Sequence, residues 1–130
     1  KWHYYLTSTR DTSRTFATRF GWGSRVPFAT RVFLPVKNQA KREVPAISAL
    51  RLKIPNVLVV EARPARGGGG IFLHLREVEG QPATITQADL ETLPELQGAD
   101  EVNVLEETLQ EGITSLSLKP FEVKFVRLMF

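Results

Sequence analysis

Hydrophobic and polar residues alternate over short stretches of this chain, and Gly, Pro or polar residues separate the stretches. A period of two places alternate side chains on opposite faces of a β-strand, so the pattern predicts strands that bury one face. The segments with this pattern, or with the aromatic, β-branched or nearly continuous apolar composition of strands, are residues 2–9, 29–36, 49–54, 56–62, 71–78, 102–105 and 115–130. They predict an all-β protein, an antiparallel β-sandwich with little or no helix.

The last sixteen residues, SLSLKPFEVKFVRLMF, contain two alternating runs joined by a Lys-Pro pair. Leu116 and Leu118 alternate with polar residues in the first run, Phe121, Val123 and Phe125 do so in the second, and we expect all five to face the core. After Phe125 the apolar residues take the opposite parity. We therefore expect either a bulge or a strand end that is buried on both faces, and both require a further layer of protein.

Other segments refine this prediction. The nearly continuous apolar run at 56–62 favours a central strand covered on both sides, and the four glycines at 67–70 favour a hairpin tip or flexible loop. In 71–78 the leucines share one face, while His74 lies on the other face and is interpreted as an outward strand residue. Helix is arguable only within 86–111, where Thr86 and Asp89 predict at most one capped turn.

Length and charge limit the organisation of the chain. A chain of 130 residues is expected to form one domain with one core. Residues 1–66 have 13 Lys and Arg against 3 Asp and Glu, a net charge of +10, whereas residues 67–130 have 4 against 11, a net charge of −7, which together give +3. Because the basic residues alternate with apolar ones, we expect strands of the two halves to interleave and neutralise these charges. A basic surface for nucleic acid is the less favoured interpretation, and no apolar run is long enough to predict a membrane span.

The sequence contains few residues arranged for chemistry. The absence of Cys excludes disulfides and thiolate sites, and His3 and His74 are far apart without a metal-ligand motif, so no metal or other cofactor is expected in this chain. Glu77 and Glu79 share a strand face and could act on a glycoside, but we expect them, like the glutamates at 106, 107 and 111, to be solvated. No catalytic residue is predicted.

Aromatic residues provide the candidate binding positions. Phe20 and Trp22 belong to a Phe-Gly-Trp-Gly segment, in which flanking glycines leave the backbone free to present a ring, and Tyr5 lies in the aromatic segment at the start of the chain. Such rings stack on sugars or anchor interfaces. We therefore treat Trp22, Phe20 and Tyr5 as carbohydrate or interface candidates, with core packing as the alternative.

Several segments also match a known sequence pattern. Residues 55–60 (PNVLVV), the glycines and residues 71–80 (IFLHLREVEG) are followed by 103–107 (NVLEE) and 118–128 (LKPFEVKFVRL). In this order they resemble the C-terminal β-sandwich of family 38 glycoside hydrolases, the α-mannosidases, whose closing strand has the form Leu-x-Pro-Phe-Glu-Ile-Lys-Thr-x-Arg-Leu. The resemblance is strongest over residues 50–130.

The resemblance implies that residues 1–130 are a single β-sandwich domain cut from the C-terminal part of a retaining, zinc-dependent α-mannosidase. The nucleophilic Asp and the zinc ligands of that family belong to an N-terminal catalytic domain, and no position of this sequence matches them. The chain alone is therefore expected to be inert, with the remaining domains of its parent as partners and with zinc in the parent's catalytic domain. The alternative from the residues themselves is a free-standing carbohydrate-binding or adhesion module.

Overall fold

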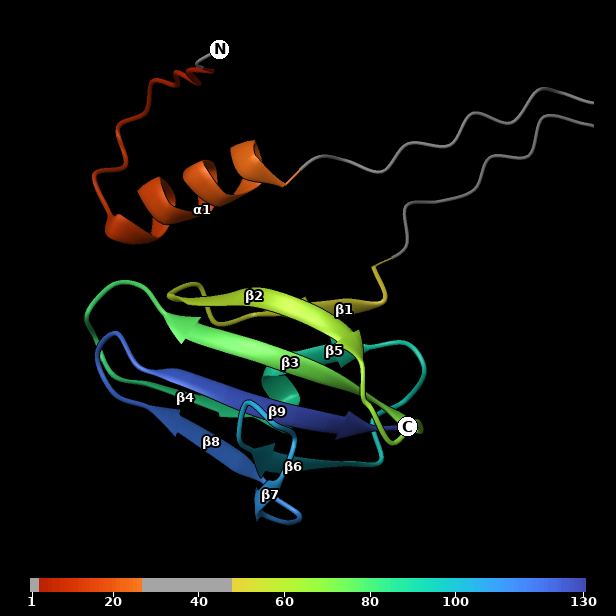
Figure 1. The fold of residues 1–130 in the computed structure, drawn as a ribbon. Coiled ribbons are helices and arrows are strands. Elements are labelled where there is room, and N and C mark those ends of the chain that lie inside the picture. Colours follow the sequence, from red (N-terminus) through yellow and green to blue (C-terminus); the bar gives the residue numbers. More distant parts are fainter. Residues whose placement is uncertain (1–2, 27–47) are drawn as a thin grey trace, which may run out of the picture.

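The computed structural model describes residues 3–26 and 48–130, and the strand predicted at 29–36 lies outside these ranges. The described part contains one α-helix, nine β-strands and one short 3-10 helix (Figure 1). In chain order they are α1 (Arg14–Arg25), β1 (Leu50–Leu52), β2 (Val57–Pro64), β3 (Gly70–Glu77), β4 (Ala83–Thr86), η1 (Gln87–Asp89), β5 (Leu90–Thr92), β6 (Gly98–Val102), β7 (Thr108–Gln110), β8 (Ser115–Leu118) and β9 (Val123–Met129).

The strands form an antiparallel β-sandwich, as the alternation predicts. One layer is a five-stranded sheet in the order β2-β3-β9-β6-β7, and the pairs β4-β8 and β1-β5 pack on its core side. Every strand pair is antiparallel. The predicted central strand at 56–62 corresponds to β2, which lies at the edge of the five-stranded sheet, so that prediction is wrong; the central strand is β9.

The core lies between the five-stranded sheet and the two strand pairs. Leu73 is paired in register with Val126 in the sheet, and Ile85 is paired with Leu116 in the opposite layer. The buried members of this core are Val57, Leu73, Leu75, Ala83, Ile85, Leu116, Leu118, Val126 and Leu128. Burial of this aliphatic surface is the main contribution to the stability of the fold.

The closing strand differs from its prediction in one respect. Phe121 and Val123 are 48% and 40% exposed and do not belong to the core. Phe121 occupies a turn with φ of 60°, and the core positions of β9 are Val126 and Leu128 rather than a continuation of the alternation from Phe121 and Val123. From Phe125 onward β9 is covered on both faces, because Phe125 stacks on Phe72 with ring centroids 5.6 Å apart while Val126 enters the core on the other side.

Three further predictions are corrected. Residues 3–9, which belong to a predicted strand, contain no strand and are exposed, whereas the 12-residue helix α1 occupies a segment for which no helix was predicted. The strand predicted at 102–105 is misplaced, because β6 ends at Val102 and residues 103–105 lie in the loop that follows it. The single turn predicted at Thr86 is confirmed as η1, with the side chain of Asp89 completing a capping box. No helix in the described ranges has the length and apolar character needed to cross a membrane.

Candidate functional site

The carboxylate of Glu77 joins three segments at one corner of the sandwich. It accepts hydrogen bonds from the backbone N–H groups of Glu79 (2.7 Å), Gly80 (2.8 Å) and Phe121 (2.8 Å) and from the side-chain amide of Asn56 (3.0 Å). Glu77 is 0% exposed although it lies at the end of β3. The carboxylate thereby satisfies backbone donors of the turns after β3 and before β9.

The same hydrogen bonds determine the pKa of the Glu77 carboxyl. Burial of Glu77 by itself raises the pKa of its carboxyl, but the hydrogen bonds from Phe121, Glu79, Gly80 and Asn56 outweigh that effect and lower the pKa to about 2. Glu77 is therefore ionised and inside the fold. The expectation that Glu77 is solvated is wrong, because tertiary hydrogen bonds compensate for its burial.

Glu79 attaches α1 to the sandwich. Its carboxylate accepts from the backbone N–H groups of Arg14 (3.3 Å) and Thr15 (2.6 Å) and from the Thr15 hydroxyl (2.7 Å). These contacts, the Thr15 hydroxyl first, lower the pKa of the Glu79 carboxyl. A carboxylate at a helix N-terminus is stabilised by the helix dipole as well as by these donors, so Glu79 is also held in place rather than freely solvated.

A second attachment lies one turn further along α1. The guanidinium of Arg19 donates to the carbonyl oxygens of Pro55 (2.9 Å from Nη2) and Val57 (3.2 Å). No residue of α1 is fully buried. The helix is therefore fixed to the edge of the sheet mainly through polar contacts.

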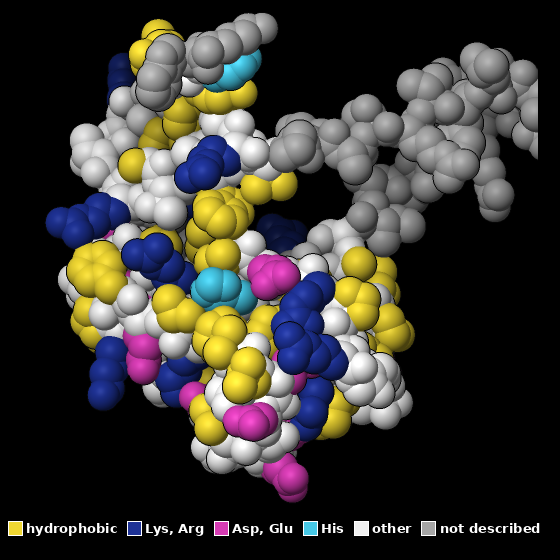
Figure 2. All heavy atoms as spheres, in the orientation of Figure 1, with side chains coloured by type: hydrophobic (Ala, Val, Ile, Leu, Met, Phe, Trp, Pro, Cys, Tyr) yellow, Lys and Arg dark blue, Asp and Glu magenta, His cyan; other side chains and the backbone are white. Residues whose placement is uncertain are grey.

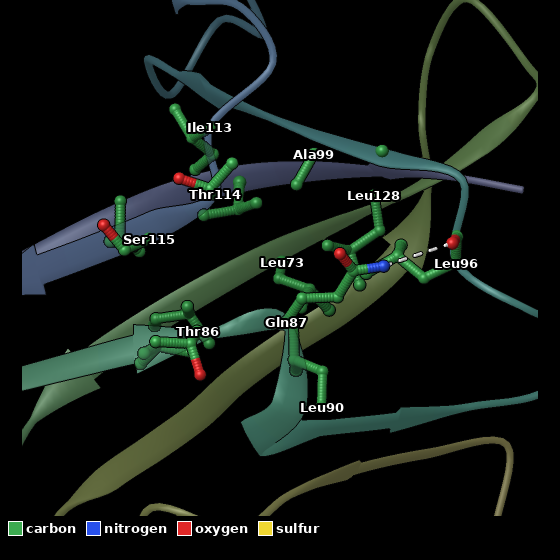
Figure 3. A pocket seen from close by; sticks show the side chains of 15 residues that line it. Leu73, Thr86, Gln87, Leu90, Leu96, Ala99, Ile113, Thr114, Ser115 and Leu128 are labelled. Atoms are coloured by element: carbon green, nitrogen blue, oxygen red, sulfur yellow. Dashed lines mark hydrogen bonds between the residues drawn. The ribbon is translucent and has the colours of Figure 1, made fainter.

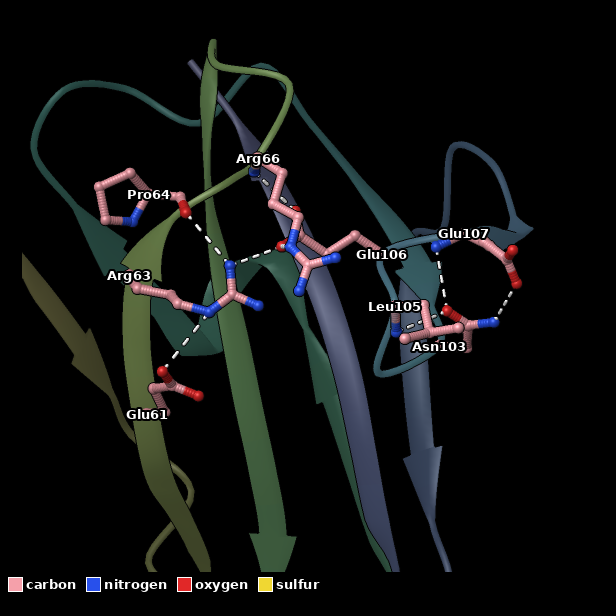
Figure 4. A network of polar contacts seen from close by, with 8 residues as sticks. All are labelled: Glu61, Arg63, Pro64, Arg66, Asn103, Leu105, Glu106 and Glu107. Atoms are coloured by element: carbon pink, nitrogen blue, oxygen red, sulfur yellow. Dashed lines mark hydrogen bonds and ion pairs between the residues drawn. The ribbon is translucent and has the colours of Figure 1, made fainter.

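A third carboxylate, Glu106, lies between Arg63 and Arg66 near the hairpin that joins β2 and β3 (Figure 4). It pairs with Arg63 at 2.5 Å and accepts from the backbone N–H of Arg66 at 2.8 Å. The guanidinium of Arg63 in turn covers the Phe72 ring, 4.0 Å from its centroid. The Arg66 amide and the Arg63 guanidinium lower the pKa of the Glu106 carboxyl, so the expectation that Glu106 is solvated is wrong.

The ion pairs also connect the basic and acidic halves of the sequence. Besides the Arg63–Glu106 pair, Glu91 on β5 lies 3.1 Å from Lys53 and 3.8 Å from Arg51 on β1. In each of these pairs the cation comes from residues 1–66 and the anion from residues 67–130. The expected interleaving of the halves is confirmed at these positions.

The three aromatic candidates lie in different environments. Phe20 and Trp22 are both half-buried on α1, and Phe20 stacks on Phe16 with centroids 6.4 Å apart. Trp22 shares the helix stripe of Thr15 and Arg19, the residues that contact the sandwich, whereas Phe20 lies on a different side. Tyr5 is 60% exposed in the segment before α1. Phe20 and Trp22 thus share an element but do not form one platform.

His74 lies on the outer face of the five-stranded sheet, as predicted. Its ring is 4.9 Å from the Phe125 ring, and burial, together with nearby Arg76, lowers the pKa of its imidazole against the opposing effect of Glu61. Figure 2 shows two histidines in cyan; the one near the centre of the view is surrounded by apolar side chains, with acidic and basic side chains beside it. Within residues 3–26 and 48–130, no group of three or more His, Asp or Glu side chains could hold a metal ion.

Two pockets lie among the described residues. The first, of about 50 Å³, lies between the layers near η1 (Figure 3). Aliphatic side chains such as Leu73, Leu90 and Ile113 line it, and Gln87 crosses it to donate to the Leu96 carbonyl oxygen at 3.4 Å. The second is a groove of about 330 Å³ between α1 and the Glu77 corner.

Some of the residues that hold α1 and the loops in place could have been predicted from the sequence, and others could not. Ser13 caps α1 by accepting from the Phe16 N–H at 3.1 Å, and a Ser three residues before an i, i+4 pair of aromatic residues is a usable helix signal. Glu106 bonds to partners 40 or more residues away, and Glu77 bonds to Phe121 at a similar separation, and no local signal exists for such contacts. No protein-family model matches the chain, and no curated protein matches it.

Proposed function

We propose that this chain is a non-catalytic β-sandwich module of a retaining, zinc-dependent α-mannosidase, in which it supports and packs against the remaining domains. The resemblance of residues 55–60, 71–80, 103–107 and 118–128 to the family 38 sandwich motivates the proposal. The antiparallel sandwich is the architecture that the resemblance implies.

One observation carries the non-catalytic part of the proposal. Three acidic side chains in the resembling segments accept hydrogen bonds within the fold: Glu77 from three backbone amides, Glu106 from Arg63 and the Arg66 amide, and Glu122 from the Lys119 amide at 2.6 Å. A glycosidase requires carboxylates that can reach a sugar from two sides. Carboxylates that hold turns and loops in place instead support a structural role.

The Glu77 corner gives this role a physical form. Asn56, Glu77 and Phe121 come from three of the resembling segments, and the Glu77 carboxylate bonds to the other two. The residues behind the sequence resemblance therefore determine the shape of one corner of the sandwich. In a multidomain enzyme, a rigid corner of this kind fixes the orientation of loops that face a neighbouring domain.

The proposal is tested by determining the coding sequence upstream of Lys1 and expressing the longer protein that it encodes. We expect several hundred residues that include a catalytic domain with Asp and His side chains, and zinc-dependent hydrolysis of an α-mannoside by the longer protein. The 130-residue chain alone should show no hydrolysis under the same conditions. A start codon close to Lys1, or hydrolysis by the 130-residue chain, would refute the proposal.

A carbohydrate titration separates the alternative, a free-standing binding module. Trp22 is half-buried on α1 and reports on its surroundings through its fluorescence. As a structural module, the chain should give a flat fluorescence response to α-mannosides. Saturable quenching that disappears in Trp22→Ala, with Phe16→Ala as a control that leaves it intact, would favour the binding module.

A further inference from the structure

The groove between α1 and the Glu77 corner has an unusual combination of walls. It is lined by Arg14, Ala17 and Thr18 from α1 and by Arg76, Val78 and Phe121 from the sandwich. Its volume of about 330 Å³ lies at the lower end of the range of small-ligand sites. Where α1 meets the sheet, Lys and Arg side chains gather beside apolar ones (Figure 2).

The two arginines supply positive charge without a direct ion pair, although the Arg14 charge acts through space on the Glu79 carboxylate and lowers the pKa of that carboxyl. Among the residues that the structure describes, neither the Arg14 nor the Arg76 guanidinium lies within 4.0 Å of a carboxylate. The nearby Glu79 carboxylate bonds to the first turn of α1 through both of its oxygens. The Arg14 guanidinium lies 5.5 Å from the centroid of the Phe121 ring, which holds it at the groove wall.

These walls suit a ligand with one anionic and one apolar part. Two guanidinium groups provide a charge of +2 and several N–H donors, which match the charge of about −1.5 to −2 and the three oxygens of a phosphate monoester. The Thr18 hydroxyl is a further polar group of the wall, and the half-exposed Phe121 ring and the side chains of Ala17 and Val78 offer an apolar surface. A carboxylate would compensate only half of this charge.

We propose that the groove is a binding site for a phosphate monoester of a small organic molecule, with Arg14 and Arg76 on the phosphate and Phe121 beside the organic part. This site is independent of the proposed role of the module in a larger enzyme. It assigns a function to two arginines that do not hold the sandwich together.

The test uses phenyl phosphate as the probe and the full 130-residue chain in about 50 mM salt. Amide shifts in NMR spectra should change saturably at Thr18, Val78 and Phe121. Arg76→Gln should weaken binding by at least about tenfold, because one charge-assisted contact is lost. Arg76 is exposed on β3, so this variant should keep the thermal stability of the wild type, which a melting curve checks.

The controls decide between a built site and non-specific attraction. Arg51→Gln removes the same charge from a distant, exposed position paired with Glu91 and should leave the affinity unchanged. Inorganic phosphate should bind more weakly than phenyl phosphate, and neutral benzyl alcohol should not shift the groove amides. The proposal would be overturned if Arg76→Gln and Arg51→Gln lost affinity equally or if inorganic phosphate bound as tightly as phenyl phosphate. The absence of any saturable amide shift would also overturn it.

Discussion

The buried carboxylate of Glu77 determines the geometry of one corner of the sandwich. It binds the amides of residues 79, 80 and 121 together with Asn56, and so connects the beginning of β2, the end of β3 and the turn before β9. Gly80 completes the corner, because its φ of +81° suits glycine and a Cβ there would lie 2.7 Å from the Phe121 ring. A charged residue therefore has a structural function at this position.

Glu77→Gln should destabilise the protein in a manner that depends on pH. The folded-state pKa of about 2 lies below the ordinary 4.5, so the stabilisation is fully present above pH 4.5 and is lost as the pH falls toward 2. At pH 7 we expect the free energy of unfolding to fall by on the order of 3 kcal/mol, and the difference from wild type to shrink by about half at pH 3. Urea unfolding at both pH values measures this.

Glu95→Gln is the matched control, because Glu95 is exposed. It should change the free energy of unfolding by less than about 0.5 kcal/mol. A difference between Glu77→Gln and wild type that stays constant from pH 7 to pH 3 would contradict the assigned role of the carboxylate.

At the scale of elements, α1 depends on the sandwich more than the sandwich depends on α1. A 12-residue helix that contains Gly21 and Gly23 is marginal by itself in water. Glu79 at its first turn and Arg19 in its middle connect it to the sheet. The helix should therefore open without unfolding of the sandwich.

Removing the Arg19 contact or the Glu79 contact should loosen α1 without loosening the sandwich. In Arg19→Gln or Glu79→Gln, amide hydrogen exchange in α1 should become faster while the amides of β3 and β9 keep their protection, since those strands are held by their own ladders. Arg25→Gln, at the exposed end of the helix, should leave both rates unchanged. Parallel loss of protection in α1 and β3 would show that helix and sandwich unfold as one unit.

Gly23→Ala should stabilise the same helix. A Cβ at Gly23 meets nothing within 4 Å, and alanine favours a helix interior over glycine by about 0.5–1 kcal/mol. Hydrogen exchange in α1 should therefore slow by roughly two- to fivefold. Gly68→Ala is the contrasting variant, because the site has equal space but a φ of +74°, and it should destabilise the β2–β3 hairpin. Faster exchange in Gly23→Ala would contradict the prediction.

Some elements of this fold follow from local sequence patterns, whereas others depend on contacts between distant segments. The inward leucines of β3 follow from local alternation, which is a property of the strand alone. The core positions of β9 do not follow from the alternation of Phe121, Val123 and Phe125, because Phe121 lies in a left-handed turn and Phe125 packs on Phe72 outside the core. The helix α1 was not predicted, because its glycines and β-branched residues have low helix propensity. Glu79 and Arg19 acquire their roles only when distant segments meet, and local patterns do not encode such meetings.

At the scale of the whole molecule, the five-stranded sheet is organised around β9. This strand pairs with β3 on one side and β6 on the other, and Leu128 is fully buried in the core. Removal of residues 126–130 should therefore abolish cooperative folding, because it deletes core side chains and the pairing partners of both neighbours. Circular dichroism and thermal melting measure the outcome. Removal of residues 1–10, of which the described ones are exposed, should leave the transition nearly unchanged, and a cooperative transition in the 126–130 deletion would contradict the prediction.

The central position of β9 also constrains how the protein is made. During synthesis, β3 and β6 leave the ribosome before the strand that joins them, so each presents an unpaired edge to the cell until β9 follows. The five-stranded sheet can therefore be completed only after β9 has been translated. The partly folded chain that exists before then is prone to aggregation. Expression at lower temperature or with added chaperones should raise the soluble yield more than any change to α1.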